Sequence, residues 1–276
     1  MALIHINFNS IYLCGNTDVN IVLPEVDYVT KPAEYYGARK KFKVLWLLHG
    51  TNGDYSDWVR KSNVELYAIE KKIAVVMPSA LNSNYADWES FAMGYRYYTY
   101  FTEELMPMIY SWFPISDKRK DNYIAGLSMG GKGTLLFALN HPELFNKAYS
   151  FSSELRPLGK PDPKLFSAKR EENLIKNFGS LKAYKESPLN LWDLSRKAVE
   201  DGIDLPDLYF ACGDKDWIAY ETFVKFREYA KQIGLKAEFF EIPGYDHEWR
   251  FWDLCLQDAL ERFFPEKGKK PLFDQK

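Results

Sequence analysis

The chain has 276 residues, of which 46% are apolar and 27% are charged, and its formal net charge is −2. This balance is typical of a globular protein that is long enough to bury a sizeable core. The near-neutral charge gives no reason to expect a nucleic acid or an anionic membrane as a partner.

No segment of the chain predicts export, membrane insertion or metal binding. Residues 1–7 lack the basic start and long apolar run of a secretion signal, so a cytoplasmic location is expected. The longest apolar runs, such as Val44–Leu48, are far too short to cross a bilayer. The three cysteines, Cys14, Cys212 and Cys255, are too widely spaced for a disulfide framework or a metal-ligand cluster.

Two hydrophobic patterns predict the strands. Apolar and polar residues alternate at 4–8 and 19–23, which is typical of half-exposed strands near an antiparallel edge. Continuous apolar runs predict strands covered on both faces, as in a parallel sheet. The clearest such run lies at residues 44–48, and further short strands are predicted at 73–77, 123–127, 148–151, 208–212 and 237–242.

Predicted helices alternate with these strands, at residues 63–71, 99–112 with a kink at Pro107, 129–140, 218–233 and 249–264. Residues 27–43 have the composition of a surface loop and 266–276 that of a charged tail. Residues 153–200 are expected to form an excursion with helical pieces, a partial lid over the strand ends. The alternation predicts an α/β fold: one doubly wound, mostly parallel sheet in a single domain spanning residues 1–276.

The most informative stretch is Gly126-Leu127-Ser128-Met129-Gly130, which fits the nucleophile-elbow pattern G-x-S-x-G. A serine hydroxyl attacks a carbonyl only if it projects free of the backbone and a base can reach it. The tight turn that achieves this crowds its neighbours, so glycine is favoured two residues before and two after. The helix that follows directs its free amides and its positive dipole end at a developing oxyanion.

The same glycine-rich segment has two other interpretations. Residues 126–133 resemble a phosphate loop, except that Gly133 stands where the magnesium-binding hydroxyl should be and Thr134 comes one position late. The segment could also be a strand-to-helix turn without any chemistry. Residues elsewhere in the chain are needed to choose among the nucleophile elbow, the phosphate loop and a turn without chemistry.

A nucleophilic serine needs a base, and the chain offers four histidines. His5 lies on the polar side of an edge strand. His49 lies in a loop better suited to supplying backbone amides, and His141 is about one helix length from the serine. His247 follows the last predicted strand and emerges at the same sheet edge as the elbow, so it is the preferred base.

Two aspartates compete for the role of the acid that orients the histidine, and both follow the strand at 208–212. The order Ser128, Asp216, His247 matches the order Ser, Asp or Glu, His of elbow hydrolases, and Asp216 is preferred. Asp214 is the alternative, with turn shaping as its ordinary role. For the oxyanion hole, the predicted donors are the backbone amides of Met129 and Thr51.

With these residues in place, the chain resembles the tributyrin esterase group of the esterase D-like α/β-hydrolases, a group related to S-formylglutathione hydrolases and to feruloyl and acetylxylan esterases. In that group the serine, the aspartate of G-x-x-D and the histidine before Glu/Ser-Trp form the catalytic triad, which implies the same three residues here. The S-formylglutathione hydrolase branch carries a different loop at residues 49–52. The resemblance is carried by Leu47-Leu48-His49-Gly50, Trp58 with Asn63-Val64-Glu65, Val76-Met77-Pro78, Tyr97-Tyr98 with Glu103-Glu104-Leu105, residues 124–131, Cys212-Gly213 with Asp216, and His247-Glu248-Trp249.

The motifs and the resemblance together predict a serine carboxylesterase that needs no metal or organic cofactor. The resemblance implies short acyl groups, acetyl to butyryl, on a small-molecule ester. Tyr85, Trp88 and Trp217 are the candidate rings of the substrate pocket. The alternatives are a carbohydrate-directed acetyl or feruloyl esterase with the same triad, a nucleotide-binding phosphotransferase, and an inactive hydrolase fold kept for binding. The oligomeric state, including a homo-oligomer, is left open.

Overall fold

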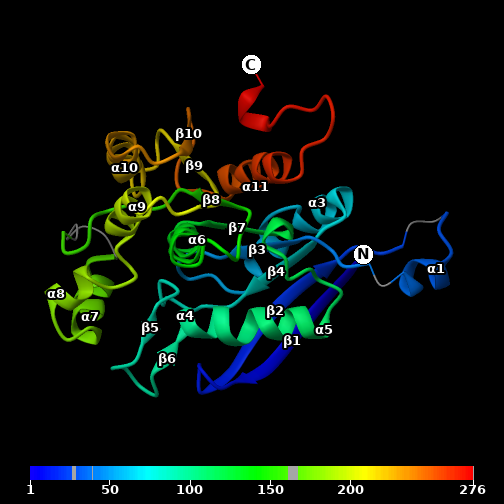
Figure 1. The fold of residues 1–276 in the computed structure, drawn as a ribbon, viewed down its shortest axis with the longest axis horizontal. Helices are drawn as coiled ribbons and strands as arrows, with labels where there is room; N and C mark the ends of the chain where they lie inside the picture. The colour runs from blue at the N-terminus through cyan, green and yellow to red at the C-terminus, as the bar shows by residue number, and fades with distance from the viewer. Residues whose placement is uncertain (27–28, 39, 161–166, 276) are drawn as a thin grey trace.

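The computed structural model describes residues 1–26, 29–38, 40–160 and 167–275. Within these residues the centre of the molecule is an eight-stranded sheet with the order β1-β2-β4-β3-β7-β8-β9-β10 (Figure 1). Its strands are β1 Ala2–Ser10, β2 Gly15–Leu23, β3 Val44–Leu48, β4 Ala74–Pro78, β7 Asn122–Leu127, β8 Lys147–Phe151, β9 Asp207–Gly213 and β10 Ala237–Ile242, and a separate small pair is formed by β5 Asp87–Trp88 and β6 Tyr95–Arg96.

The direction of the strands follows the hydrophobic patterns. The half-exposed strands β1 and β2 pair antiparallel at one edge, and β2 also runs antiparallel to β4. All remaining neighbours in the sheet are parallel. Residues 44–48 of β3 are fully buried because both of their faces are covered. The predicted mostly parallel sheet with an antiparallel edge is therefore confirmed.

Helices cover both faces of the sheet (Figure 1). One buried cluster joins α5, α6, α9 and α10 to one face, and a second joins α3 and α11 to the other. Among the described residues no helix is both long and apolar enough to cross a membrane. The helices are α1 Pro32–Gly37, α2 Asp57–Lys61, α3 Val64–Lys71, α4 Tyr97–Thr99, α5 Met106–Trp112, α6 Met129–Asn140, α7 Ser167–Asn177, α8 Leu181–Lys185, α9 Leu191–Glu200, α10 Tyr220–Ile233 and α11 Trp249–Phe263.

The structure corrects the predicted elements in two places. The expected loop at 27–43 contains α1, which begins at Pro32, where a proline is tolerated because the first helical amide needs no partner; residues 27, 28 and 39 lie outside the described residues. The expected helix at 99–112 is divided, with a π-helical segment η1 at Tyr100–Leu105 before α5. Pro107, which has no amide to donate, lies in the first turn of α5, directly after η1.

The excursion at 153–200 and the C-terminal tail both contain regular structure. Helices α7, α8 and α9 lie in the excursion, as the predicted helical pieces; residues 161–166 lie outside the described residues, and movement of this region as a lid stays a prediction. The tail includes a 3-10 turn, η3 Leu272–Asp274. The backbone amide of Phe273 donates to the buried carboxylate of Asp258 at 2.8 Å, so this end of the chain is attached to α11.

Four loops leave the carboxyl ends of β3, β7, β9 and β10. Because these strands are parallel, the loops emerge at one edge of the sheet. This edge brings together residues that lie far apart in the sequence.

Candidate active site

Ser128 lies in the sharp turn between β7 and α6, with φ 52° and ψ −115°. This left-handed, strained backbone projects the side chain out of the turn. Glycine is required on both sides because the backbones approach closely. A Cβ at Gly126 would lie 2.6 Å from the carbonyl carbon and oxygen of Gly130, and a Cβ at Gly130 would lie 2.5 Å from the carbonyl oxygen of Leu48.

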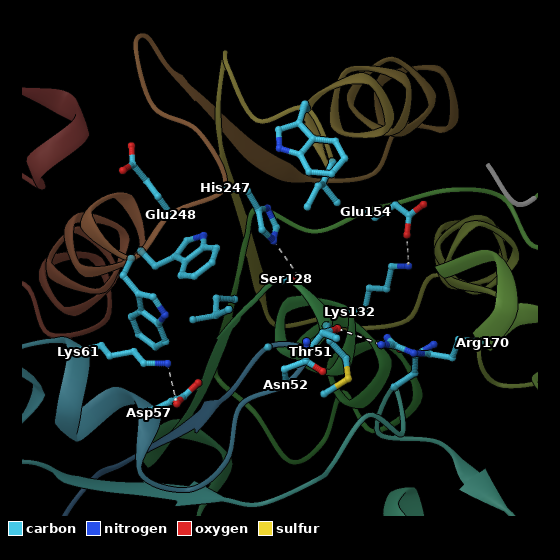
Figure 2. Close-up of a pocket in the computed structure, with 18 residues that line it drawn as sticks. Thr51, Asn52, Asp57, Lys61, Ser128, Lys132, Glu154, Arg170, His247 and Glu248 are labelled. Carbon is cyan, nitrogen blue, oxygen red and sulfur yellow. Dashed lines mark hydrogen bonds and ion pairs between the residues drawn. The ribbon is translucent and has the colours of Figure 1, made fainter. Parts of the chain in front are cut away.

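His247 reaches the serine from the loop after β10. Its Nε2 lies 3.0 Å from the Oγ of Ser128, a hydrogen-bond distance between residues 119 positions apart (Figure 2). The imidazole is 13% exposed, and Trp252 of α11 packs edge-on against it with ring centroids 5.0 Å apart. One nitrogen of the ring therefore faces the hydroxyl, and an indole supports the ring from the side.

Asp216, rather than Asp214, lies against His247. Its fully buried carboxylate places Oδ2 2.9 Å from the Nδ1 of His247. The other oxygen accepts the backbone amides of Ile218 and Ala219 at 3.1 and 2.9 Å, so the carboxylate is held in one orientation. Because a carboxylate accepts, Nδ1 carries the proton and Nε2 presents its lone pair to the hydroxyl.

Asp214 has the turn-shaping position that its ordinary role predicts. Its Oδ1 accepts the backbone amide of Gly244 at 2.6 Å. This bond joins the loop after β9, which carries Asp216, to the loop after β10, which carries His247. Asp214 thus holds two loops together without contacting the imidazole.

The other three histidines have structural partners. His5 lies 2.9 Å from Asp18, and the Nε2 of His141 lies 2.7 Å from the hydroxyl of Tyr98. His49 is buried; its Nε2 accepts the amide of Ala80 at 2.9 Å, and its Nδ1 donates to the carbonyl of Gly50 at 2.7 Å. Burial lowers the pKa of His49, which favours this neutral, two-bonded form.

Thr51 and Met129, whose amides are the predicted donors of an oxyanion hole, lie in the loop after β3 and at the start of α6. Both residues line the same cavity as Ser128, and neither amide donates a hydrogen bond to any described residue. The loop carrying Thr51 is attached to the segment after β4, because the amide of Asn52 donates to the side chain of Asn82 at 2.8 Å and the side chain of Asn82 donates to that of Asn52 at 2.9 Å. Two N–H groups without an acceptor among the described residues are what the predicted oxyanion hole requires.

A cavity of about 470 Å³ opens over Ser128. Of the three predicted pocket rings, Trp217 lines it and is 70% exposed. Tyr85 and Trp88 are corrections, because neither is among the described residues that line it. Tyr85 is buried with its hydroxyl donating to the carbonyl of His49 at 3.1 Å, and the Nε1 of Trp88 donates to the carbonyl of Ser83 at 2.8 Å.

Two further tryptophans that the sequence argument missed, Trp249 and Trp252, also line the cavity. They lie in the first turn of α11, directly after the loop of His247. Their position in the sequence directly after His247, the candidate base, was the signal that could have identified them as pocket residues. Leu127, Ile218 and these rings supply the apolar lining of the cavity. Its charged lining forms two groups, with Lys132, Glu154 and Arg170 on one side and Asp57, Lys61 and Glu248 on the other (Figure 2).

The geometry does not support the phosphate-loop interpretation. The hydroxyl of Thr134 donates to the carbonyl of Gly130 at 2.9 Å inside α6, so it is engaged where a magnesium ligand would have to be free. A Cβ at Gly133 would lie 2.6 Å from the ring of Tyr85, so helix packing explains this glycine. The glycines serve the close approach of the elbow and α6 to their neighbours.

Comparison with known proteins identifies the family. The model of the family described as "Putative esterase" matches residues 15–263. The chain belongs to this esterase family. The esterase is 31% identical over 265 residues to an acetyl esterase of Caldicellulosiruptor saccharolyticus, an alignment that covers 95% of this chain and 97% of the relative.

Solved structures give the same result. An S-formylglutathione hydrolase of Staphylococcus aureus is 33% identical with a TM-score of 0.77, covering 95% of this chain and 98% of the other. A fluorophosphonate-binding serine hydrolase of the same bacterium is 31% identical with a TM-score of 0.78, covering 96% and 99%. The esterase therefore has the α/β-hydrolase fold and is a carboxylic ester hydrolase, as the sequence predicted.

Proposed function

We propose that the esterase hydrolyses short-chain acyl esters through a covalent acyl-enzyme formed on Ser128. His247 takes the hydroxyl proton as the oxygen attacks the ester carbonyl, and Asp216 holds the imidazole tautomer and stabilises the imidazolium. The amides of Thr51 and Met129 bind the oxyanion. His247 then gives the proton to the departing alcohol, and water releases the acid by the same two steps.

The observation that carries this proposal is the continuous row of contacts across the site. The distance from Asp216 Oδ2 to His247 Nδ1 is 2.9 Å, and that from His247 Nε2 to Ser128 Oγ is 3.0 Å. Three residues from three separate loops supply the carboxylate, the imidazole and the hydroxyl. A histidine with only a structural role would not need a buried carboxylate on one ring nitrogen and a serine hydroxyl on the other, beside a cavity.

Substitution of the serine and the histidine tests the triad. Ser128→Ala should reduce turnover of p-nitrophenyl acetate by a factor on the order of 10⁶, and His247→Ala should cause a loss of similar size. His141→Ala is the matched control, because His141 lies at the far end of α6 and bonds to Tyr98. Ser128→Ala enzyme that still reacts with a fluorophosphonate probe at the wild-type rate would refute the assignment.

The size and lining of the cavity support acyl groups from acetyl to butyryl. Leu127, Trp249 and Trp252 wall the apolar side, and the relative from Caldicellulosiruptor is named as an acetyl esterase. A series of p-nitrophenyl esters should give the highest kcat/KM at two to four acyl carbons and a steep fall at eight. A maximum at eight carbons would reject the short-chain preference.

One observation favours a carbohydrate-linked ester as the second candidate. Trp217 lies at the rim of the cavity with 70% of its surface exposed, and an exposed indole beside a catalytic centre can stack on a sugar ring. Trp217→Ala should then lower activity on acetylated xylan more than on p-nitrophenyl acetate. Equal losses on both substrates would leave the small ester as the better assignment.

A further inference from the structure

The charged side of the cavity contains an arginine that reaches it from the excursion. Arg170 of α7 donates from Nη1 to the side-chain oxygen of Asn84 at 2.6 Å and from Nη2 to the hydroxyl of Thr51 at 3.1 Å (Figure 2). Both acceptors are neutral. The guanidinium is thus fixed next to the loop that carries one of the two free amides.

Within the part of the chain that the structure describes, no carboxylate contacts the guanidinium of Arg170 directly. It forms no ion pair with any residue of the described ranges, and burial lowers its pKa, with Glu154 acting in the opposite direction. A guanidinium has five N–H donors, of which these two bonds use two. A partly buried cation of this kind is costly unless something else neutralises it.

Glu154 is shared with two other cations. Its Oε2 lies 3.3 Å from the ammonium of Lys132, which also lines the cavity, and its Oε1 lies 2.8 Å from Arg156. The carboxylates that follow Arg170 on α7 are engaged elsewhere: Glu171 accepts the amide of Gly159, and Glu172 pairs with Lys169. Among the described residues, one carboxylate therefore faces three cations on this side.

The described residues of the opposite side of the cavity carry no excess of positive charge, because the carboxylate of Glu248 lines it in addition to a paired lysine and aspartate (Figure 2). The ammonium of Lys61 lies 2.9 Å from the carboxylate of Asp57, one pair of opposite charges (Figure 2). An excess of positive charge is thus confined to the side that holds Lys132 and Arg170. Because Arg170 bonds to the side chain of Thr51, a substrate with its carbonyl at the amides of Thr51 and Met129 would lie close to this charge.

We propose that Arg170 and Lys132 form a subsite for a carboxylate group on the substrate, so that the esterase prefers esters bearing a negative charge near the scissile bond. The proposal rests on the proposed function, because the subsite is defined relative to Ser128. The planar guanidinium can accept a carboxylate in a two-pronged contact, and the ammonium adds a point charge. The negative charge of the substrate is carried by either the acyl part or the alcohol part of the ester.

Paired esters that differ only in charge test the proposal. On the alcohol side the pair is 4-acetoxybenzoate and 4-acetoxybenzamide; on the acyl side it is mono-p-nitrophenyl glutarate and its terminal amide. The measured quantity is the ratio of kcat/KM for the charged ester to that for the neutral ester, after subtraction of spontaneous hydrolysis. The pair with the higher ratio identifies which part of the ester carries the charge.

In the wild-type enzyme at least one ratio should exceed one, and Arg170→Gln should reduce it by a factor on the order of 10 to 100, mainly through the KM of the charged ester. Lys132→Gln should reduce the same ratio less. The matched control is Lys61→Gln, which removes a cation from the opposite side of the cavity and should leave the ratio unchanged. Added salt should lower the ratio in the wild-type enzyme, which checks the proposal without any substitution.

Two results would overturn the subsite. The first is a charged-to-neutral ratio in Arg170→Gln that equals the wild-type ratio. This includes the case in which both esters of a pair lose activity equally, since Arg170 would then only hold Thr51 in place. The second is a wild-type ratio below one for both pairs. Failure of the proposed function is distinguishable, because it appears as neutral-ester activity that survives Ser128→Ala.

Discussion

The Oδ2 of Asp216 lies 2.9 Å from the Nδ1 of His247, across 31 residues of chain. Asp216→Asn would present an amide that can donate to Nδ1 and so favour the wrong tautomer. We expect kcat on p-nitrophenyl acetate to fall by a factor on the order of 10⁴, with little change in the melting temperature. Asp214→Asn is the matched control and should cost far less than that; equal losses in the two variants would contradict the assignment of the acid.

Gly130 lies where the elbow touches the backbone at the end of β3. A Cβ there would be 2.5 Å from the carbonyl oxygen of Leu48 and 2.6 Å from that of His49. Gly130→Ala should therefore lower the free energy of unfolding by about 1–3 kcal/mol and displace Ser128 from the free amides. Urea unfolding measures the first effect and turnover the second. Gly37→Ala, which has open space around it, should change neither; a Gly130→Ala enzyme of wild-type stability would be inconsistent with the close contact.

His49 should make stability depend on pH. Burial lowers its pKa in the folded state, so below about pH 6.5 the unfolded chain binds a proton that the folded chain does not. The free energy of unfolding should therefore fall as the pH drops from 6.5 toward the folded pKa, by at most about 1.4 kcal/mol per pH unit. Urea unfolding at pH 7 and pH 5.5 checks this. His49→Gln should reduce the slope, and an identical slope in the variant would exclude His49 as its source.

Asp258 joins α11 to β8 and to the C-terminal turn. Its buried carboxylate accepts the hydroxyl of Tyr149 at 2.9 Å and pairs with Arg262 at 2.7 Å. Asp258→Ala should lower the free energy of unfolding by about 3 kcal/mol, because it leaves the buried hydroxyl of Tyr149 without its acceptor and leaves buried Arg262 only with more exposed carboxylates. Asp207→Ala removes an exposed carboxylate and should cost at most about 1 kcal/mol. Calorimetry compares the two variants, and equal losses would show that the buried network adds no stability.

Much of this architecture could be predicted because its signals are local. The apolar run of β3 and the glycines around Ser128 reflect constraints that act within a few residues, namely burial on both faces and close backbone approach. The chain order Ser128, Asp216, His247 could be combined with them because all loops after parallel strands emerge at one edge. Element types were therefore predictable even where boundaries, as at 99–112, were not.

The lining of the cavity could not be predicted in the same way, because it depends on side-chain direction. Tyr85 has a left-handed backbone, with φ 56°, and its hydroxyl bonds inside the core to the carbonyl of His49. Trp249 and Trp252 face the cavity only because of how α11 packs. Arg170 comes from the excursion, and no spacing in the sequence relates it to Thr51, 119 residues earlier.

The edge-on packing of Trp252 on His247 gives the protein a built-in optical signal. A protonated imidazole quenches the emission of a neighbouring indole more strongly than a neutral one does. Fluorescence of Trp252 should therefore dim as His247 gains a proton and recover when the proton leaves. The difference in fluorescence between the wild-type protein and Trp252→Phe, followed with pH, would report on that single ring without any attached dye.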